Sequence, residues 1–349
     1  MRVFHGPTNI GGIGRYVSDY LRKQGIVSDF ITYNDNTRRH NHHINFQLNA
    51  LPLWQRLLIA ELIFKPLFFL FCLWRYTHFN FYFGATFFCG NWDLPILKLF
   101  GKKIIMTYCG SDIRLMEVER KRNPYWQLID SKSNRPEQDK NKIKMMKFQS
   151  RWVDRFIAVR NLIAPVATVI PREKLITDIW VNNAFDVAKL LQRPLHYNTV
   201  PVIVHAPSAP GVKGTKYIQA AIAELRSEGW QFEYREVAGM PNSEAQRLYQ
   251  ECDIIIDQLL LGGFGNLAVE GMALGKPVCC YLIEEVKEQY FPDCPILNCT
   301  IENLASRLRW LIQNPEEIRR IGFLGREYVR RHFNTEEIFE QLLRVYKCL

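Results

Sequence analysis

The chain has 349 residues, so at roughly 150 residues per domain the length predicts two domains. Hydrophobic residues make up 48% and charged residues 23%, which excludes a disordered, collagen-like or low-complexity protein. Lys and Arg number 45 against 35 Asp and Glu, a net charge of +10 that favours an acidic partner: nucleic acid, an anionic membrane or a phosphorylated substrate.

Nine cysteines are spread along the chain, and no Cys-x-x-Cys pair occurs. An odd number without metal-site or redox spacing is typical of reduced, buried thiols. The start, Met1 to Gly6, turns polar and glycine-rich at once, so we expect no signal peptide. We therefore predict a cytoplasmic protein, with the inner face of a membrane as the open alternative.

The first elements read as a strand, a glycine loop, a helix and a returning strand. Arg2 to Phe4 is the first strand, Gly11-Gly12-Ile13-Gly14 is the loop, and Val27 to Tyr33 is the second strand. The helix between them ends at Gly25. Its apolar residues follow the helical spacing i, i+3, i+4, i+7, i+8: Ile13, Tyr16, Val17, Tyr20 and Leu21.

The segment from Leu51 to Arg75 is strongly apolar but interrupted by charges. Its longest uncharged run, Pro66 to Trp74, has nine residues, whereas a membrane-spanning helix needs ~20, so we predict that it does not span a membrane. We expect a buried pair of helices. An interfacial helix that touches a membrane stays open, because Trp54 and Trp74 flank the segment and the chain is basic.

Two stretches interrupt the alternation of predicted strands and helices. The polar stretch Glu117 to Lys147 is rich in charges, and we expect a long excursion with helical pieces over a ligand cleft. The periodicity is also lost at Gln192 to Asn198, so we place the linker between the domains around residues 186–198.

The second half repeats the opening unit. Val202 to His205 is a strand, Pro207 to Gly214 a loop, and Phe232 to Val237 the returning strand. The helix between them presents Ile218, Ala221, Ile222 and Leu225 on one face. Two such starts about 200 residues apart predict two Rossmann-like halves. The alternation continues with strands at Cys252–Asp257 and Val278–Leu282 and helices at Ser243–Gln250, Glu302–Gln313, Glu316–Arg331 and from Asn334 onward.

The stretch Asp257 to Val278 carries the strongest chemical signal. Three glycines, at 262, 263 and 265, let the backbone approach a ligand closely. The free N–H groups that begin the following helix, at Gly265, Asn266 and Leu267, form an anion site. Glu270 lies about one turn in. Its carboxylate is placed to accept hydrogen bonds from the hydroxyls of a ribose whose attached diphosphate docks at the helix N-terminus. The alternative is a Glu that only complements the helix dipole.

Gly263-Phe264-Gly265, Glu270, Met272-Ala273 and Gly275-Lys-Pro-Val278 together resemble the signature of the retaining glycosyltransferases of GT-B fold, family 4 (glycosyl transferases group 1). The resemblance implies an α/β fold of two Rossmann-like domains facing a cleft. It also implies that Glu270 binds the ribose of a nucleotide-diphosphate sugar. Members of this class need no metal, so we expect none and no cofactor.

Further matches extend the resemblance along the chain. Lys213-Gly214 resembles the pair that grips the donor diphosphate, and the family's N-terminal glycine loop falls on Gly11 to Gly14. Tyr108 to Arg114 resembles a His-Gly-Ser-Asp loop, with Cys109 where a His is frequent, and Asn182 to Asp186 resembles the segment that ends the first domain. The implied site comprises Lys213 and Asp112 as catalytic residues; Gly12, Gly14, Lys213, Phe264, Gly265, Asn266, Leu267 and Glu270 at the donor; and Arg15, Ser111 and Arg114 at the acceptor or cleft.

The sequence also departs from the family pattern. Gly262 stands where the signature has its first Glu, and Ser208 stands where a donor-binding Arg is usual. Two alternative functions therefore stay open: a non-catalytic nucleotide-sugar-binding or partner protein on the same fold, and a GT-B nucleotide-sugar epimerase. His40, His42 and His43 lie among arginines without a carboxylate or thiol partner, so we expect a solvated loop.

We thus predict an N-terminal Rossmann-like acceptor domain (1–190), a C-terminal donor domain (191–333) and a last helix (334–349) that packs back on the first domain. The predicted function is transfer of a sugar from a nucleotide-diphosphate sugar to a glycan, lipid-linked or small-molecule acceptor with retention at the anomeric carbon. Peripheral membrane contact is a further expectation. No nucleic acid partner is expected, because no RNA-recognition or helix-turn-helix signature accompanies the basic charge.

Overall fold

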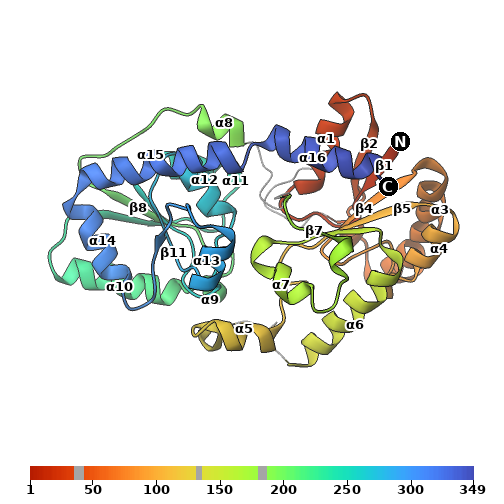
Figure 1. The fold of residues 1–349 in the computed structure, drawn as a ribbon, viewed down its shortest axis with the longest axis horizontal. Coiled ribbons are helices and arrows are strands. Elements are labelled where there is room, and N and C mark those ends of the chain that lie inside the picture. The colour runs from red at the N-terminus through yellow and green to blue at the C-terminus, as the bar shows by residue number, and fades with distance from the viewer. Residues whose placement is uncertain (35–42, 131–135, 180–186) are drawn as a thin grey trace. The chain divides into compact units, whose positions relative to one another are not determined.

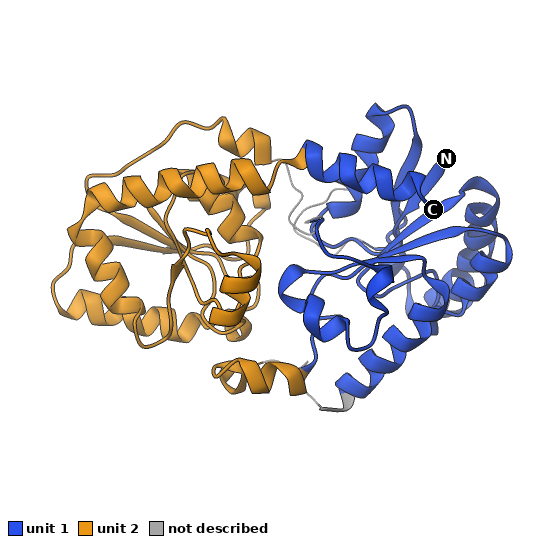
Figure 2. Cartoon of the chain, viewed as in Figure 1, with its two compact units in different colours: residues 1–115, 137–185, 336–349 blue, residues 116–136, 186–335 orange. Residues whose placement is uncertain are grey.

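A computed structural model describes residues 1–34, 43–130, 136–179 and 187–349 (Figure 1). His40, His42 and the Asn182 to Asp186 segment lie outside the described residues. The chain forms two compact α/β units (Figure 2). Unit 1 comprises Met1–Leu115, Glu137–Phe185 and Glu336–Leu349, and unit 2 comprises Met116–Pro136 and Asp186–Thr335.

Unit 1 is built on a parallel seven-stranded sheet in the order β3-β2-β1-β4-β5-β6-β7. The strand order reverses between β1 and β4, because β2 and β3 lie on one side of β1 and the later strands on the other. Its elements are β1 Arg2–His5, α1 Ile13–Lys23, β2 Val27–Thr32, β3 Ile44–Asn45, η1 Leu48–Ala50, α2 Leu53–Gln55, η2 Arg56–Phe64, α3 Lys65–Arg75, β4 His78–Tyr82, η3 Cys89–Asn91, α4 Asp93–Leu99, β5 Lys103–Thr107, α6 Pro136–Trp152, β6 Arg155–Ile157, η5 Arg160–Leu162, α7 Ile163–Val166, η6 Arg172–Lys174, β7 Leu175–Ile176 and α16 Thr335–Lys347.

The C-terminal helix α16 packs within unit 1, although it follows unit 2 in the chain. Asn80 Nδ2, on the buried strand β4, donates a hydrogen bond to the Tyr346 hydroxyl at 2.7 Å. The rings of Tyr20 and Phe339 lie 5.4 Å apart and join α16 to α1. A buried amide bonded to a buried phenol fixes the position of α16, because both polar groups are satisfied only in this arrangement.

The apolar segment forms one continuous helix from Leu53 to Arg75, not the buried pair that we expected. Its middle, η2, is π-helical. Ala60 of η2 and Phe68 and Cys72 of α3 are buried against the rest of unit 1. Most of the other side chains are exposed. The prediction failed because a helix that is apolar on every side is typical of a buried one.

Unit 2 is built on a parallel five-stranded sheet in the order β12-β11-β10-β8-β9. The segment Met116–Pro136 packs on this unit: Trp126 and Ile129 join a cluster with Leu260, and Asn123 Nδ2 donates to the Leu260 carbonyl at 2.7 Å. The elements are α5 Met116–Arg122, η4 Trp126–Leu128, α8 Val187–Leu191, β8 Val202–His205, α9 Pro210–Lys213, α10 Thr215–Ser227, β9 Glu233–Glu236, α11 Asn242–Glu251, β10 Ile254–Ile256, α12 Asn266–Ala273, β11 Val278–Cys280, α13 Glu284–Tyr290, β12 Leu297–Asn298, α14 Leu304–Gln313 and α15 Pro315–His332.

Helix α15 holds α12 at very close range. A Cβ atom on Gly322 would lie 2.0 Å from the carbonyl oxygen of Gly275, which follows α12. Gly325, one turn further, faces Met272 of α12, with 3.3 Å available for a Cβ. Glycines at these two positions therefore let α15 support the helix that carries the predicted donor residues.

Candidate functional site

In unit 2, an ion pair lies at the carboxyl ends of the parallel strands. Lys213 Nζ, at the end of α9, lies 2.5 Å from Oδ1 of Asp257, which follows β10. The Lys213 side chain is 14% exposed and that of Asp257 is fully buried. The other oxygen of Asp257 accepts the backbone N–H of Gly265 at 2.7 Å. One carboxylate thus ties the predicted diphosphate-binding Lys to the N-terminus of α12.

Asp257 was not among the residues that the sequence singled out. It was visible only as the polar end of an isoleucine-rich strand, and its partner lies 44 residues away in the chain. Its position has a chemical consequence: a carboxylate already occupies one N–H at the start of α12. The remaining positive charge for an incoming anion comes from Lys213 and from the positive end of the α12 dipole.

The glycine loop before α12 leaves no room for a side chain at its first position. Gly262 has a φ of 71°, a left-handed conformation that favours glycine. A Cβ there would lie 2.5 Å from Cδ1 of Ile283. The loop therefore cannot take the Glu that the signature has at this position without moving. Two residues on, the Phe264 ring packs against Phe291 at 4.7 Å.

Glu270 lies in the second turn of α12 and is 3% exposed. The Nε2 of Gln246, on α11, approaches Glu270 Oε1 at 3.4 Å. Asn266 and Leu267 open the helix, and Leu267 is buried. Lys213, Gly265, Asn266 and Glu270 are therefore brought together around one helix terminus, within one unit.

A buried histidine, His205, links the end of β10 to the start of α10. His205, at the end of β8, meets the carbonyl oxygen of Ile256 through Nδ1 at 2.9 Å, so Nδ1 carries the proton. Nε2 then accepts the hydroxyl of Thr215, the first residue of α10, at 2.9 Å. Burial lowers the pKa of His205, which favours the neutral ring that this pair of bonds requires.

The N-terminal glycine loop of unit 1 is shaped by conformation and by packing. Gly12 caps α1 in the left-handed region, with φ 78°, and its N–H donates to Asn9 Oδ1 at 2.9 Å. A Cβ on Gly14 would lie 2.7 Å from the Phe30 ring. Gly14 thus lets α1 approach the sheet, whichever ligand the loop binds. Arg15 forms an ion pair with Asp19 at 2.6 Å.

The predicted catalytic Asp112 shapes its own loop. Its carboxylate accepts the backbone N–H groups of Gly110, at 2.7 Å, and Cys109, at 3.2 Å. Burial raises the pKa of Asp112 to about 6, although these two N–H groups work in the opposite direction. Beside it Ser111 is exposed, and the carbonyl of Arg114 accepts a hydrogen bond from Lys142 Nζ at 2.7 Å.

His43, expected in a solvated loop, is instead anchored in unit 1. Its Nδ1 accepts the N–H of Phe30 at 3.0 Å, and Nε2 lies 3.0 Å from Asp19 Oδ1. The expectation was wrong because the partners come from β2 and α1, which are distant in sequence. Within the described ranges, no group of three or more His, Cys, Asp or Glu side chains is placed to hold a metal ion.

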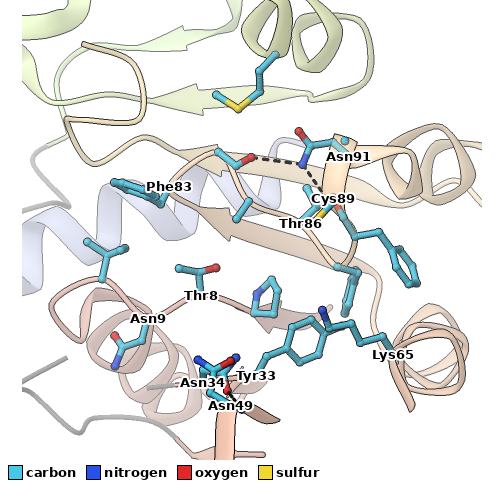
Figure 3. A pocket seen from close by; sticks show the side chains of 18 residues that line it. Thr8, Asn9, Tyr33, Asn34, Asn49, Lys65, Phe83, Thr86, Cys89 and Asn91 are labelled. Carbon is cyan, nitrogen blue, oxygen red and sulfur yellow. Dashed lines mark hydrogen bonds between the residues drawn. The ribbon is translucent and has the colours of Figure 1, made fainter. Parts of the chain in front are cut away.

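A pocket of about 750 Å³, which the sequence did not reveal, opens in unit 1 (Figure 3). Residues after β1, β2 and β4 line it, so it lies at the carboxyl ends of the strands where their order reverses, the usual ligand position in such sheets. Figure 3 shows Thr8 and Asn9 on one wall and Phe83 and Thr86 on the facing wall, with Lys65 reaching in from the long helix.

The wall formed by residues 83–91 is rigidly supported. Asp93, fully buried, accepts the Thr86 hydroxyl at 2.6 Å, and Asn91 Nδ2 donates to the same hydroxyl oxygen at 2.9 Å. Gln149 Nε2 donates to Asn91 Oδ1 at 2.9 Å. Phe83 has a φ of 60°, a strained conformation for a bulky residue that persists only where surrounding contacts impose it, often at ligand sites.

The two units and their sheets define the fold class: this is the GT-B fold of glycosyltransferases, as predicted. Anabaena HepE in complex with UDP-glucose superposes with a TM-score of 0.66 over 100% of both chains at 12% identity. A glycosyltransferase from Rickettsia africae gives a TM-score of 0.63 over 99% of this chain and 97% of that one, at 15% identity.

Comparison of sequences matches a smaller part of the chain than comparison of structures. No family model matches the chain. A trehalose synthase from Rubrobacter xylanophilus is 26% identical over 137 residues, which cover 35% of this chain and 33% of that protein. The chain thus spans about a third of the length of this curated relative.

Proposed function

We propose that the protein is a glycosyltransferase that takes a sugar from a nucleotide-diphosphate sugar. The observation that carries the proposal is the cluster at the N-terminus of α12, where Lys213, the backbone of residues 265–267 and Glu270 converge. A positively charged amine beside a helix N-terminus suits a diphosphate, and a carboxylate one turn into the helix suits ribose hydroxyls. The complex of HepE, which shares this fold, with UDP-glucose supports the same donor class.

In the proposed mechanism the diphosphate leaves as the glycosidic bond breaks, and its negative charge grows. Lys213 stabilises that charge and Asp257 holds the ammonium in place. We propose retention at the anomeric carbon, with the leaving diphosphate helping to deprotonate the acceptor on the same face. The reaction as proposed needs no metal and no cofactor. Asp112, placed in a loop of unit 1, stays a proposed catalytic residue.

The acceptor is proposed to bind unit 1. Its pocket joins amide and hydroxyl side chains, such as Thr8, Asn34 and Asn49, to aromatic rings, a combination that suits a carbohydrate or a polar head group. All nine cysteines are free thiols, which supports the proposed cytoplasmic location.

A thermal-shift series with UDP-glucose, other nucleotide-diphosphate sugars and nucleoside monophosphates tests the donor class. A ligand that binds only the folded state raises stability by RT ln(1 + [L]/Kd), so a diphosphate donor should raise Tm and a monophosphate should do so less. The matched variants are Lys213→Ala and Lys216→Ala, two neighbouring lysines of which only Lys213 pairs with Asp257. Equal shifts for both variants, or none for the wild type, would count against the proposal.

One observation favours a second candidate, a non-catalytic nucleotide-sugar-binding protein. The backbone at Gly262 excludes the side chain that the family signature has there. Product analysis separates the two functions: a transferase releases nucleoside diphosphate from the donor when an acceptor is present, whereas a binding protein returns the donor intact.

A further inference from the structure

The helix Leu53–Arg75 concentrates the exposed apolar surface of the molecule. Of the 22 large hydrophobic side chains exposed in the described residues, 11 lie on this helix. Leu62 is 68% exposed and Trp74 is 83% exposed. Soluble proteins rarely leave such a contiguous apolar face in water, so a face of this kind marks an interaction surface.

The inner side of the same helix is fixed to unit 1. Ala60, Phe68, Phe69 and Cys72 are buried, and the Phe68 ring packs on Phe46 at 5.1 Å. The helix has the length and apolarity needed to cross a membrane, with 28% of its most apolar window buried. Because its inner stripe rests on the unit that carries the sheet, the helix lies along the surface of unit 1 (Figure 1). Its other side is free to face a partner.

Charges and tryptophans on the helix indicate what that partner is. The helix carries three basic residues, Arg56, Lys65 and Arg75, and one acidic residue, Glu61. Lys65 is 14% exposed and pairs with Glu61 at 2.5 Å, so Arg56 and Arg75 give the helix its net charge of +2. Trp54 and Trp74 lie near the two ends of the helix. Tryptophans beside basic residues and an apolar face are typical of a helix lying in the interface of an anionic bilayer.

A second copy of the chain fits this surface less well. An isologous contact would bring together two copies of a helix with a net charge of +2, because its one acidic residue, Glu61, is already paired with Lys65. Anionic lipid head groups supply the missing negative charge, as the net charge of +10 also favours.

We propose that unit 1 docks on the surface of an anionic lipid bilayer through the exposed face of the Leu53–Arg75 helix. Lys65 links this face to the pocket of unit 1, because it belongs to the helix and also lines the pocket. The docked helix therefore presents the pocket next to the bilayer. This step rests on the proposed glycosyl transfer: the acceptor would then be a molecule that a lipid anchors in the membrane.

Vesicle flotation of the full chain tests the docking. The wild type should float with vesicles of phosphatidylcholine and phosphatidylglycerol, less with phosphatidylcholine alone, and less as salt rises, because salt screens exposed charges. The variant Leu58→Ser/Leu62→Ser/Trp74→Ser should lose at least about tenfold in partitioning, since each exposed apolar side chain removed weakens burial in the interface. The matched control Phe323→Ser/Leu324→Ser removes exposed apolar residues from α15 of unit 2 and should float like the wild type.

The outcomes separate this proposal from the donor assignment. Circular dichroism and the Tm shift with UDP-glucose, measured on the same variants, report the fold and the donor site independently of lipid. Equal flotation of the triple variant and the wild type would overturn the docking. So would a wild type that ignores both vesicle types but dimerises in solution, with the triple variant monomeric. Either result can stand beside an intact response to UDP-glucose.

Discussion

Asp257 holds the ammonium of Lys213 and the N–H of Gly265 with its two oxygens, at 2.5 and 2.7 Å. A buried carboxylate with two such partners fixes the geometry of both. Breaking a buried pair by removing one partner usually destabilises by about 3–5 kcal/mol, because the other charge is left uncompensated. Any variant of Lys213 therefore has a structural effect as well as a chemical one, and the two must be measured separately.

Lys213→Ala is expected to lower kcat by ~10²–10³ and to change KM less, because a positioned charge stabilises the leaving diphosphate mainly in the transition state. The double variant Lys213→Ala/Asp257→Asn removes the orphaned charge, so it should recover stability but not turnover. Steady-state kinetics and urea unfolding of both variants check this. If the double variant regained turnover, Lys213 would act only through folding.

Glu270→Gln keeps the shape of the side chain and removes its charge. Hydrogen bonds to charged groups are worth ~1.5–3 kcal/mol, so the affinity for a nucleotide-diphosphate sugar should fall by tens-fold. Isothermal titration gives the affinity directly. Glu251→Gln, a partly exposed residue at the C-terminal end of α11 in the same unit, is the control and should bind like the wild type. An unchanged Kd for Glu270→Gln would assign this buried Glu to packing of α12.

Gly322→Ala should destabilise unit 2 by about 1–3 kcal/mol, because the new methyl group would meet the Gly275 carbonyl at 2.0 Å. Elsewhere in a helix the same change stabilises by about 1 kcal/mol. Gly325→Ala, with 3.3 Å to Met272, is the matched control and should cost less. Thermal unfolding ranks the two variants, and the opposite ranking would mean that α15 shifts easily on α12.

His5 should make the protein less stable in acid. Burial, reinforced by the nearby His43, lowers its pKa to about 3 from 6.5. In the unfolded chain His5 is protonated below about pH 6.5, whereas in the folded chain it stays neutral down to about pH 3. The stabilisation of the folded state that is present above pH 6.5 is therefore lost as the pH falls toward 3. Between pH 7.5 and 5 this amounts to about 2 kcal/mol.

Urea unfolding at both pH values measures this loss for the wild type, for His5→Gln and for His196→Gln. The His5 variant should show a smaller loss than the wild type, while the exposed His196 serves as the control. The same loss in all three proteins would place the acid sensitivity at other groups, among them His205, whose pKa burial also lowers.

Local patterns predicted the elements that build the two sheets. The helix expected after Gly12 runs from Ile13 to Lys23, and the strand expected at Cys252–Asp257 is β10, Ile254–Ile256. These signals are local: helical spacing, apolar runs and glycine stops. The loop–helix cluster around Gly265 was found the same way, because strand, glycine turn and helix follow one another in the chain.

What the sequence did not reveal depends on contacts between distant segments. The pocket of unit 1 is lined by loops after three strands and by Lys65 of the long helix, which share no motif. The role of Asp257 requires Lys213 to approach across a loop. The exposure of the Leu53–Arg75 helix could not be read from composition either, because the same apolar residues also suit a buried helix.

Docking on a bilayer, as proposed, would change how the protein meets its acceptor. Held there by the Leu53–Arg75 helix, the protein would diffuse in two dimensions along the membrane, and a lipid-anchored acceptor would stay within reach between encounters. Confinement of this kind raises the effective concentration of the acceptor without any tighter contact in the pocket. The location of the protein on the membrane would then select the acceptors it meets, before any acceptor hydroxyl enters the pocket beside Lys65.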